Sequence, residues 1–318
     1  MLEIRNLIKI YVSRYNSGTQ RIVALNGINL IAKPGKITAL IGDSGSGKTT
    51  LIKVIAGLLK PSAGEVLVNN KIHVHQLSGK QLEKYRTKYI GYLSQRPSEN
   101  IPFETYTLRE LLELPLILEG VGKQERDVRV KDLLAKVDLQ GLSDRVVKVL
   151  SGGEAQRLAV LMSIIKKPQI FLADEPTGEL DEENAKKLFK LMKELTEEYD
   201  CTTIIVSHDP MILNFCDKAY RLRNGVIQSI IEPKKKFSGK GEMEDYFMSE
   251  DFDYLFLDNY GRVAIPHKLI QEIDFSSKIY LKRLKKGLIL SSDSNYLEKL
   301  AIKEVRKQAN QQSKKGEK

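Results

Sequence analysis

The chain has 318 residues, a hydrophobic fraction of 42% and a formal net charge of +10. This length is enough for one large α/β domain and a smaller second one. No stretch approaches the ~18 consecutive apolar residues that a membrane span needs, and the first residues resemble an alternating strand rather than a signal peptide. The two cysteines show no disulfide or metal pattern, which favours a reducing compartment. The charge alone does not choose among nucleic acid, an anionic membrane and a polyphosphate as partner.

The first predicted elements are two strands. Residues 2–7 alternate between apolar and polar side chains, and residues 22–31 are their predicted antiparallel partner. Tyr11 and Tyr15 fall between these strands. An aromatic ring there can stack on a base, which contributes about 1–3 kcal/mol. A tyrosine that merely ends a strand is the plainer alternative.

A glycine-rich stretch, residues 42–50, carries the strongest chemical signal in the chain. It fits the pattern G-x-x-x-x-G-K-[ST], with an apolar run before it and residues 51–55 at helical spacing after it. In a strand, loop and helix of this kind, backbone N–H groups and the positive helix end face a phosphate. The lysine reaches the β- and γ-phosphates and the threonine ligates Mg²⁺. The predicted nucleoside triphosphate site comprises Gly42, Asp43, Ser44, Gly45, Ser46, Gly47, Lys48, Thr49 and Thr50.

The middle of the chain changes from strands to helices. Residues 65–68 and 89–94 are predicted strands, and the second of them leads to Gln95. Across residues 96–150, leucine and valine recur at helical intervals with charges between them, which indicates a mainly helical insertion. The segment Ser151–Glu154 then opens a helix with the spacing of a capping box.

Two buried strands follow, and polar side chains come after each. Residues 170–173 are all apolar and lead directly to Asp174 and Glu175, while residues 202–206 are followed by His208. Open α/β sheets hold ligands at the carboxyl ends of their strands, so a site explains the two carboxylates better than a loop cap does. A lone histidine is usually structural, but this one is better placed than most. The last predicted elements of this domain are a helix over 181–199 and a hairpin of 219–222 and 226–230.

Together, these segments resemble the ATP-binding subunits of ABC transporters. The matching segments, in the order of the family, are the phosphate loop, Gln95, the signature Leu150-Ser151-Gly152-Gly153-Glu154-Ala155-Gln156, Asp174-Glu175, Asp181 and His208. The resemblance covers residues 1–231. It implies an α/β fold of the P-loop NTPase class, in which a RecA-like parallel sheet is joined by an antiparallel β subdomain and a helical insertion.

Within the family, residues 174–181 resemble the exporter branch that serves lipoprotein-release, macrolide-efflux and cell-division permeases. Glu179 stands where that branch usually has asparagine, and Glu154 stands where glutamine is common. Neither change removes a group that the chemistry requires. The loop between the first two strands runs long for the branch, so the choice of Tyr11 or Tyr15 as the residue that stacks on adenine stays open, with Tyr11 preferred.

The resemblance also implies a mechanism. Two copies of the chain close head-to-tail over two ATP molecules, and each signature, Ser151 to Gly153, binds the γ-phosphate held by the other copy. Catalysis is positioning and charge stabilisation. The implied roles are metal binding by Thr49, Gln95 and Asp174, activation of water by Glu175, bracing of the γ-phosphate by His208, relay to an integral-membrane permease by Gln95, and action across the dimer by Asp181. The implied location is the cytoplasmic face of the cell membrane.

Past residue 231 the composition shifts. Residues 232–250 are typical of a flexible linker, and residues 293–318 form a polar tail that we expect to be disordered at its end. Between them, residues 251–292 resemble the swapped-hairpin fold of AbrB-type regulators, through the run Gly261–Pro266. That fold closes its core by exchanging hairpins between chains, so it implies dimerisation. A small β-module with a similar turn is the alternative.

Two other functions compete with an exporter ATPase. A soluble ABC ATPase for DNA repair or translation would resemble a fused double cassette or carry a long coiled-coil insertion, and the sequence shows neither. An ATP-dependent DNA-binding regulator is favoured by the basic charge and the final module. DNA affinity that falls steeply with salt would support it. Acidic residues are interspersed in the module, so nucleic acid is not expected as a partner.

Overall fold

The computed structural model of the chain describes residues 1–15, 18–95, 105–233, 280–284 and 287–291. The chain divides into two compact units, Met1–Ala264 and Ile265–Lys318. The first unit contains an antiparallel sheet of order β2-β1-β4-β5 and a larger sheet of order β10-β9-β3-β8-β7-β6. The strands of the first unit are β1 Leu2–Tyr15, β2 Gly18–Ala32, β3 Lys36–Ile41, β4 Ala63–Val68, β5 Ile72–His73, β6 Ile90–Leu93, β7 Ile170–Asp174, β8 Thr202–Ser207, β9 Lys218–Arg223 and β10 Val226–Ile231.

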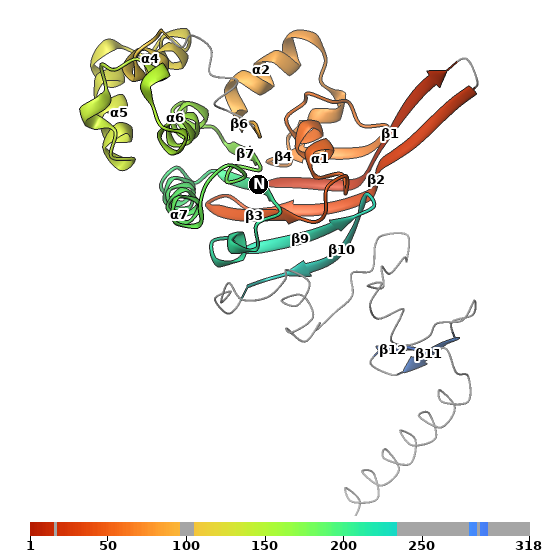
Figure 1. Cartoon of the computed structure of the whole chain (residues 1–318). Coiled ribbons are helices and arrows are strands. Elements are labelled where there is room, and N and C mark those ends of the chain that lie inside the picture. The colour runs from red at the N-terminus through yellow and green to blue at the C-terminus, as the bar shows by residue number, and fades with distance from the viewer. Residues whose placement is uncertain (16–17, 96–104, 234–279, 285–286, 292–318) are drawn as a thin grey trace, which may run out of the picture. The chain divides into compact units, whose positions relative to one another are not determined.

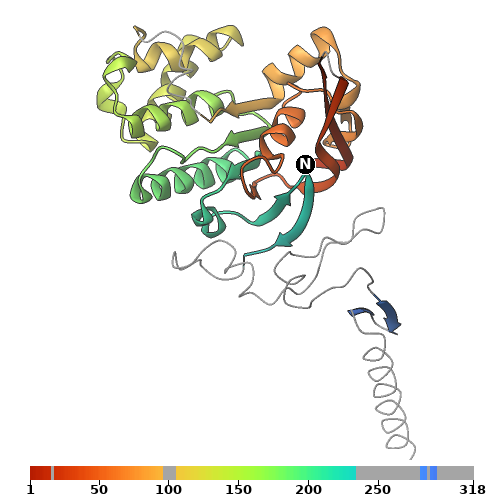
Figure 2. The ribbon, with the colours of Figure 1, turned by 45° about the vertical axis from the view of Figure 1, so that its right-hand side comes forward.

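Helices of the first unit gather against these sheets (Figure 1). The α-helices are α1 Lys48–Ile55, α2 Gly79–Tyr89, α4 Leu108–Leu118, α5 Lys123–Lys136, α6 Gly152–Ile164 and α7 Glu182–Glu198. Figures 1 and 2 both show α4 and α5 at the end of the unit away from the β1–β2 hairpin. The helical insertion is thus confirmed within 105–150, while α2 precedes it and was not predicted.

The larger sheet is buried on both faces, which explains its almost continuous apolar strands. In β3, Ile37 and Ala39 belong to the hydrophobic cluster that includes α6 and α7, whereas Leu40 belongs to the cluster with α1 and the antiparallel sheet. Strand side chains alternate between faces, so each of these strands must be apolar on both sides. Strands β9, β3, β8, β7 and β6 run parallel, and β10 pairs antiparallel with β9. The carboxyl ends of the five parallel strands therefore meet at one edge of the sheet.

The β1–β2 hairpin is longer than predicted. The prediction ended the first strand at residue 7, but β1 continues to Tyr15. Tyr11 therefore lies inside β1, paired with Ile22, and is not in a connecting loop. Register shifts interrupt the pairing between Ile4 and Leu7 and again between Lys9 and Ile10. Such bulges break the simple alternation that marks a strand in a sequence, which is why the extension was missed.

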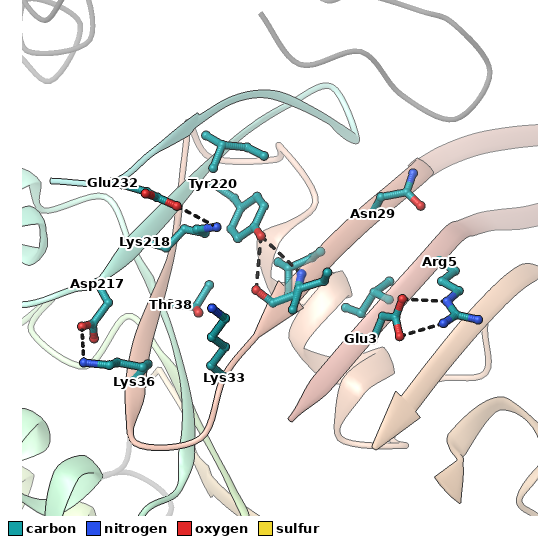
Figure 3. Close-up of a pocket in the computed structure, with 14 residues that line it drawn as sticks. Glu3, Arg5, Asn29, Lys33, Lys36, Thr38, Asp217, Lys218, Tyr220 and Glu232 are labelled. Atoms are coloured by element: carbon teal, nitrogen blue, oxygen red, sulfur yellow. Dashed lines mark hydrogen bonds and ion pairs between the residues drawn. The ribbon is translucent and has the colours of Figure 1, made fainter. Parts of the chain in front are cut away.

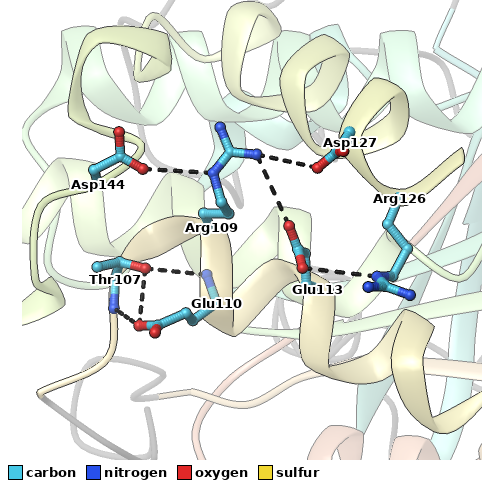
Figure 4. Close-up of polar contacts among 7 residues, drawn as sticks. All are labelled: Thr107, Arg109, Glu110, Glu113, Arg126, Asp127 and Asp144. Atoms are coloured by element: carbon cyan, nitrogen blue, oxygen red, sulfur yellow. Dashed lines mark hydrogen bonds and ion pairs between the residues drawn. The ribbon is translucent and has the colours of Figure 1, made fainter. Parts of the chain in front are cut away.

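Apolar packing and a charged network hold the helical insertion together. Arg109 of α4 donates to Asp127 of α5 and to Asp144, both at 3.4 Å, and Glu113 lies 3.7 Å from Arg126 (Figure 4). Thr107 and Glu110 form a capping box at the start of α4. Partly exposed ion pairs each contribute little, so the network orients α4 against α5 more than it stabilises them. The buried side chains of these two helices, which belong to the core cluster shared with α6 and α7, are Leu108, Leu111, Leu112, Leu116, Val130, Leu133 and Leu134.

Gly91 marks a close approach of backbones, because a Cβ there would lie 2.1 Å from the Ser163 carbonyl oxygen of α6. We expect Gly91→Ala to lower the free energy of unfolding by about 1–3 kcal/mol, since β6 and α6 must separate. Gly141→Ala is the matched control, because a Cβ at Gly141 meets nothing within 4 Å. Urea unfolding of both variants measures the effect, and equal stability of the two would contradict this packing.

The second unit is described only in a hairpin. Strands β11, Tyr280–Leu284, and β12, Gly287–Ser291, pair antiparallel. The sequence predicted strands at 279–284 and 288–290, so the hairpin is confirmed. The run Gly261–Pro266, the 232–250 linker beyond Pro233 and the polar tail lie outside the described residues.

Candidate functional site

The phosphate loop connects β3 to α1 and has a backbone that only glycine accommodates at two positions. Gly42 and Gly47 have φ values of 147° and 106°. A Cβ would lie 2.1 Å from the Leu222 carbonyl oxygen at Gly42 and 2.5 Å from the Ala24 carbonyl oxygen at Gly47. Both the torsion and the space therefore exclude a side chain. This geometry confirms the strand, loop and helix expected around residues 42–50.

Lys48 is held at this loop by backbone oxygens. Its ammonium donates to the carbonyls of Gly42 at 2.7 Å and Asp43 at 2.9 Å. Burial lowers the pKa of Lys48, while the nearby carboxylates of Glu175 and Asp174 oppose that shift. The side chain therefore places a partly desolvated positive charge beside the loop. Such a charge interacts more strongly with an anion than one in water does.

Thr49 and Asp174 make direct contact, although 125 residues separate them in sequence. The Thr49 hydroxyl donates to Asp174 Oδ1 at 3.2 Å. Asp174 ends β7, is 2% exposed, and has its pKa raised by burial, which outweighs the hydrogen bond from Thr49. A hydroxyl and a carboxylate are hard oxygen donors of the kind that suits Mg²⁺. The described residues contain no group of three His, Cys, Asp or Glu able to hold a metal alone.

Asp174→Asn is expected to raise the free energy of unfolding of the protein without nucleotide or metal near neutral pH. The raised pKa means that the native state is destabilised by the ionised carboxyl, a cost that builds as pH rises from the unfolded-state pKa to the folded-state pKa. Asparagine removes that cost and still accepts from Thr49. The gain should shrink as pH falls through the folded-state pKa and vanish below the unfolded-state one. Urea unfolding with EDTA across pH measures it, and a gain independent of pH would contradict this origin.

Glu175 lies directly beyond β7 in a left-handed backbone conformation. Its φ is 51°, and its N–H donates to the Val206 carbonyl of β8 at 2.9 Å. Its Oε2 accepts from the His208 N–H at 3.1 Å and lies 2.7 Å from His208 Nδ1. The Glu175 side chain is 12% exposed and the His208 side chain 68%. Backbone of this kind in a residue other than glycine is uncommon and clusters at functional sites. The sheet thus joins the two strand-end groups that the sequence singled out.

Tyr11 lies beside the phosphate loop. Its hydroxyl is 3.4 Å from the Thr50 hydroxyl of α1, and its ring is 5.3 Å from the Lys9 ammonium. Tyr15 pairs with Gly18 at the far end of the hairpin. The contact with Thr50 therefore places Tyr11 next to the helix that follows the phosphate loop. Gln95 is exposed and follows β6, at the same sheet edge as Asp174.

The signature residues form a second helix start. Ser151 is the N-cap of α6, and its N–H donates to Glu154 Oε2 at 2.8 Å, so the predicted capping box is present. Asp181 is the N-cap of α7 and accepts from the Asn184 N–H at 2.9 Å. Ser151 and Gly152 are exposed. Among the described residues, no hydrogen bond joins this segment to the phosphate loop. The contacts therefore divide the predicted residues into a cluster at the sheet edge and an exposed helix start.

One contact was missed by the sequence reasoning. Gln156, on α6 and 8% exposed, donates from Nε2 to the Pro176 carbonyl, directly after Glu175. This hydrogen bond ties the signature helix to the segment that leads from Glu175 to Asp181. A glutamine at a buried position of a helix was the signal that could have revealed it, because buried amides nearly always have partners.

Comparison with known proteins agrees with this geometry. The sequence pattern of the family described as ABC transporter matches residues 25–178. The chain is 38% identical to the lipoprotein-releasing system ATP-binding protein LolD of Saccharophagus degradans, over 68% of this chain and 93% of that protein. It is 34% identical to the macrolide export ATP-binding/permease protein MacB of Vibrio parahaemolyticus, over 71% of this chain and 33% of that protein.

A solved structure gives the same fold. The ATP-binding cassette MJ0796, described as a dimer in a post-hydrolysis state bound to ADP and phosphate, superposes with a TM-score of 0.65 and 31% sequence identity. The match covers 74% of this chain and all of that one. The phosphate loop, the strand-end carboxylates and these likenesses together identify the chain as a member of the ABC transporter family, an ATP-binding subunit with ATPase activity.

Proposed function

We propose that the chain hydrolyses ATP to drive a separate integral-membrane permease of the exporter type. The observation that carries this proposal is the contact cluster at the sheet edge, which includes Lys48, Thr49, Asp174, Glu175 and His208. The likeness to LolD and MacB, whose names describe lipoprotein release and macrolide export, supports an exporter. In the described ranges, no helix is both long and apolar enough to cross a membrane. In this proposal a separate permease supplies the membrane-spanning helices.

Each residue of the cluster has a defined task in this proposal. Lys48 stabilises charge on the transferred phosphoryl group, and Tyr11 stacks on adenine. Glu175 takes a proton from the attacking water, and His208 braces the γ-phosphate while holding the Glu175 carboxylate in place. Mg²⁺, held by Thr49, Asp174 and Gln95, would neutralise negative charge on the phosphates. The chemistry is positioning and electrostatic stabilisation, as in other phosphoryl transfers.

The exposed start of α6 supports a head-to-tail homodimer in the ATP-bound state. Its N–H groups and positive helix end form an anion site, and Ser151 and Gly152 face outward where a second copy can present a γ-phosphate. Asp181 lies at the start of α7 and acts across the same interface. The dimeric MJ0796 cassette supports this arrangement. Hydrolysis by this chain therefore requires two copies and two ATP molecules.

In this proposal the chain lies at the cytoplasmic face of the membrane, where its partner is a permease and not nucleic acid. The helical insertion exposes apolar side chains on both of its helices, with Ile117 at 49%, Leu118 at 80% and Val128 at 59% exposed. Together with Gln95 they provide a surface for a membrane protein. Affinity purification of the tagged chain from detergent-solubilised cells tests the proposal. Recovery of a multi-span membrane protein supports it, and repeated recovery of nucleic acid instead would contradict it.

We also propose that residues 1–231 form the complete ATPase domain and that residues 251–292 tether two copies as an AbrB-like module. Truncation after Glu232 should leave each ATP site chemically intact but make turnover more dependent on protein concentration, because tethering raises the effective concentration of the second domain. ATPase assays over a range of chain concentrations measure this. The same concentration dependence in the full and truncated chains would contradict the tether.

A further inference from the structure

A pocket of about 650 Å³ lies in the first unit, between the amino end of β3 and strands of both sheets (Figure 3). Thr38 of β3 lines it, four residues before Gly42. At ~3.3 Å per residue, that separation is about 13 Å along the strand. The pocket therefore lies toward the end of β3 opposite to the phosphate loop. Its volume is in the range of pockets that hold small organic molecules.

Most charges that line the pocket neutralise one another. Lys36 lies 3.0 Å from Asp217, and Lys218 lies 3.0 Å from Glu232. Arg5 is likewise paired with Glu3 at 2.7 Å. Each of these cations is already balanced by a carboxylate of the pocket wall. These three ion pairs define the rim of the pocket, but they provide no net charge that could bind a ligand.

Two polar groups of the pocket remain without such partners. Lys33 makes no ion pair or hydrogen bond among the described residues, and Figure 3 shows its ammonium reaching toward Thr38. Thr38 is 2% exposed, and in the described part of the chain its hydroxyl has no hydrogen bond. Because Thr38 lines the pocket, its hydroxyl can donate to an acceptor that fills the pocket. One ammonium and one hydroxyl together suit a single negative charge.

The rest of the pocket offers apolar surface. Ile31, near the end of the edge strand β2, is 48% exposed, and Ile230 and the ring of Tyr220 line the same space. The Tyr220 hydroxyl lies 3.2 Å from the Ile31 carbonyl oxygen and 3.3 Å from its nitrogen. It is therefore already satisfied and contributes mainly its ring. An apolar body, and not a second polar group, fits beside Lys33 and Thr38.

We propose that this pocket binds an amphipathic carboxylate, whose carboxyl group accepts from Lys33 and Thr38 and whose apolar body covers Ile31, Ile230 and Tyr220. A phosphate is a poorer fit, because phosphate sites usually provide several donors around the anion. The site is separate from the ATP site and from every residue that we assign to hydrolysis. Nothing in the ATPase mechanism uses Lys33 or Thr38.

Isothermal titration of the full chain with decanoate tests the proposal. Lys33→Glu should weaken decanoate binding at least about tenfold, and Thr38→Val should weaken it less, because a hydrogen bond to a charged group contributes about 1.5–3 kcal/mol. Lys71→Glu is the matched control, since Lys71 is exposed and lies outside the pocket. Acetate lacks the apolar body and should not bind at the same concentration.

Acetylation of lysines adds a measurement that does not depend on folding of a variant. Decanoate should protect Lys33 of the wild-type chain from an amine-acetylating reagent, as read by mass spectrometry, and leave Lys71 unprotected. No decanoate binding, or binding equal in Lys33→Glu and Lys71→Glu, would overturn the proposal. ATP turnover of Lys33→Glu should match the wild type, so failure here leaves the proposed ATPase function untouched.

Discussion

Replacement of Glu175 by glutamine is expected to lower ATP turnover about 10²–10⁴-fold, the usual contribution of a positioned general base. Glutamine keeps the shape of the side chain, and its oxygen can still accept from the His208 N–H, so the site should keep its geometry. It cannot take the proton of the attacking water. ATP binding should therefore persist, and an ATP-bound dimer should accumulate, because closure no longer ends in hydrolysis.

Glu179→Gln provides the matched control for this prediction. It is the same chemical change four residues later, at an exposed position outside the contact cluster. Turnover of that variant should be close to that of the wild type. Steady-state phosphate release and sedimentation with ATP measure the two effects. Near-normal turnover of Glu175→Gln would remove Glu175 from the role of general base.

Lys48→Ala and Ser151→Arg should both abolish most turnover, but by different routes. Lys48→Ala removes the side chain that the phosphate loop holds through two carbonyls, so ATP affinity of the single chain should fall. Ser151→Arg places a bulky side chain at the exposed start of α6, so it should leave binding to the single chain intact and prevent the dimer. Titration with a fluorescent ATP analogue, followed by sedimentation, separates these effects. An equal loss of ATP affinity in both variants would contradict two separate sites.

The sequence predicted the core of the site because each part has its own local signal. The glycines of residues 42–50 are required by backbone torsion and by lack of space for a side chain. The buried strands before Asp174 and His208 are recognisable as mainly apolar runs in the sequence. Parallel pairing of β3, β8 and β7 then brings these ends to one edge. The contact between Thr49 and Asp174 follows directly from that topology. Strand order did not need to be known in detail, since any parallel sheet that places these strands together joins the same groups.

Other features carry no comparable local signal. The extension of β1 to Tyr15 depends on bulged pairing with β2, which disturbs the alternation of side chains. The hydrogen bond from Gln156 to Pro176 depends on how α6 packs, and the pocket beside Lys33 depends on how two sheets meet. Tertiary contacts between distant segments decide all three. Local sequence patterns therefore predict the functional residues at the strand ends, but they do not predict the contacts between helices and sheets that are distant in the sequence.

A mixing experiment tests the central claim, that each active site is shared by two copies of the chain. In a head-to-tail pair of Lys48→Ala with Ser151→Arg, one site carries both defects, and the other combines an intact phosphate loop with an intact signature. Each variant alone should be nearly inactive, and an equimolar mixture should recover a substantial fraction of wild-type ATP turnover. Absence of recovery at every mixing ratio and concentration, with both variants folded, would contradict the shared site.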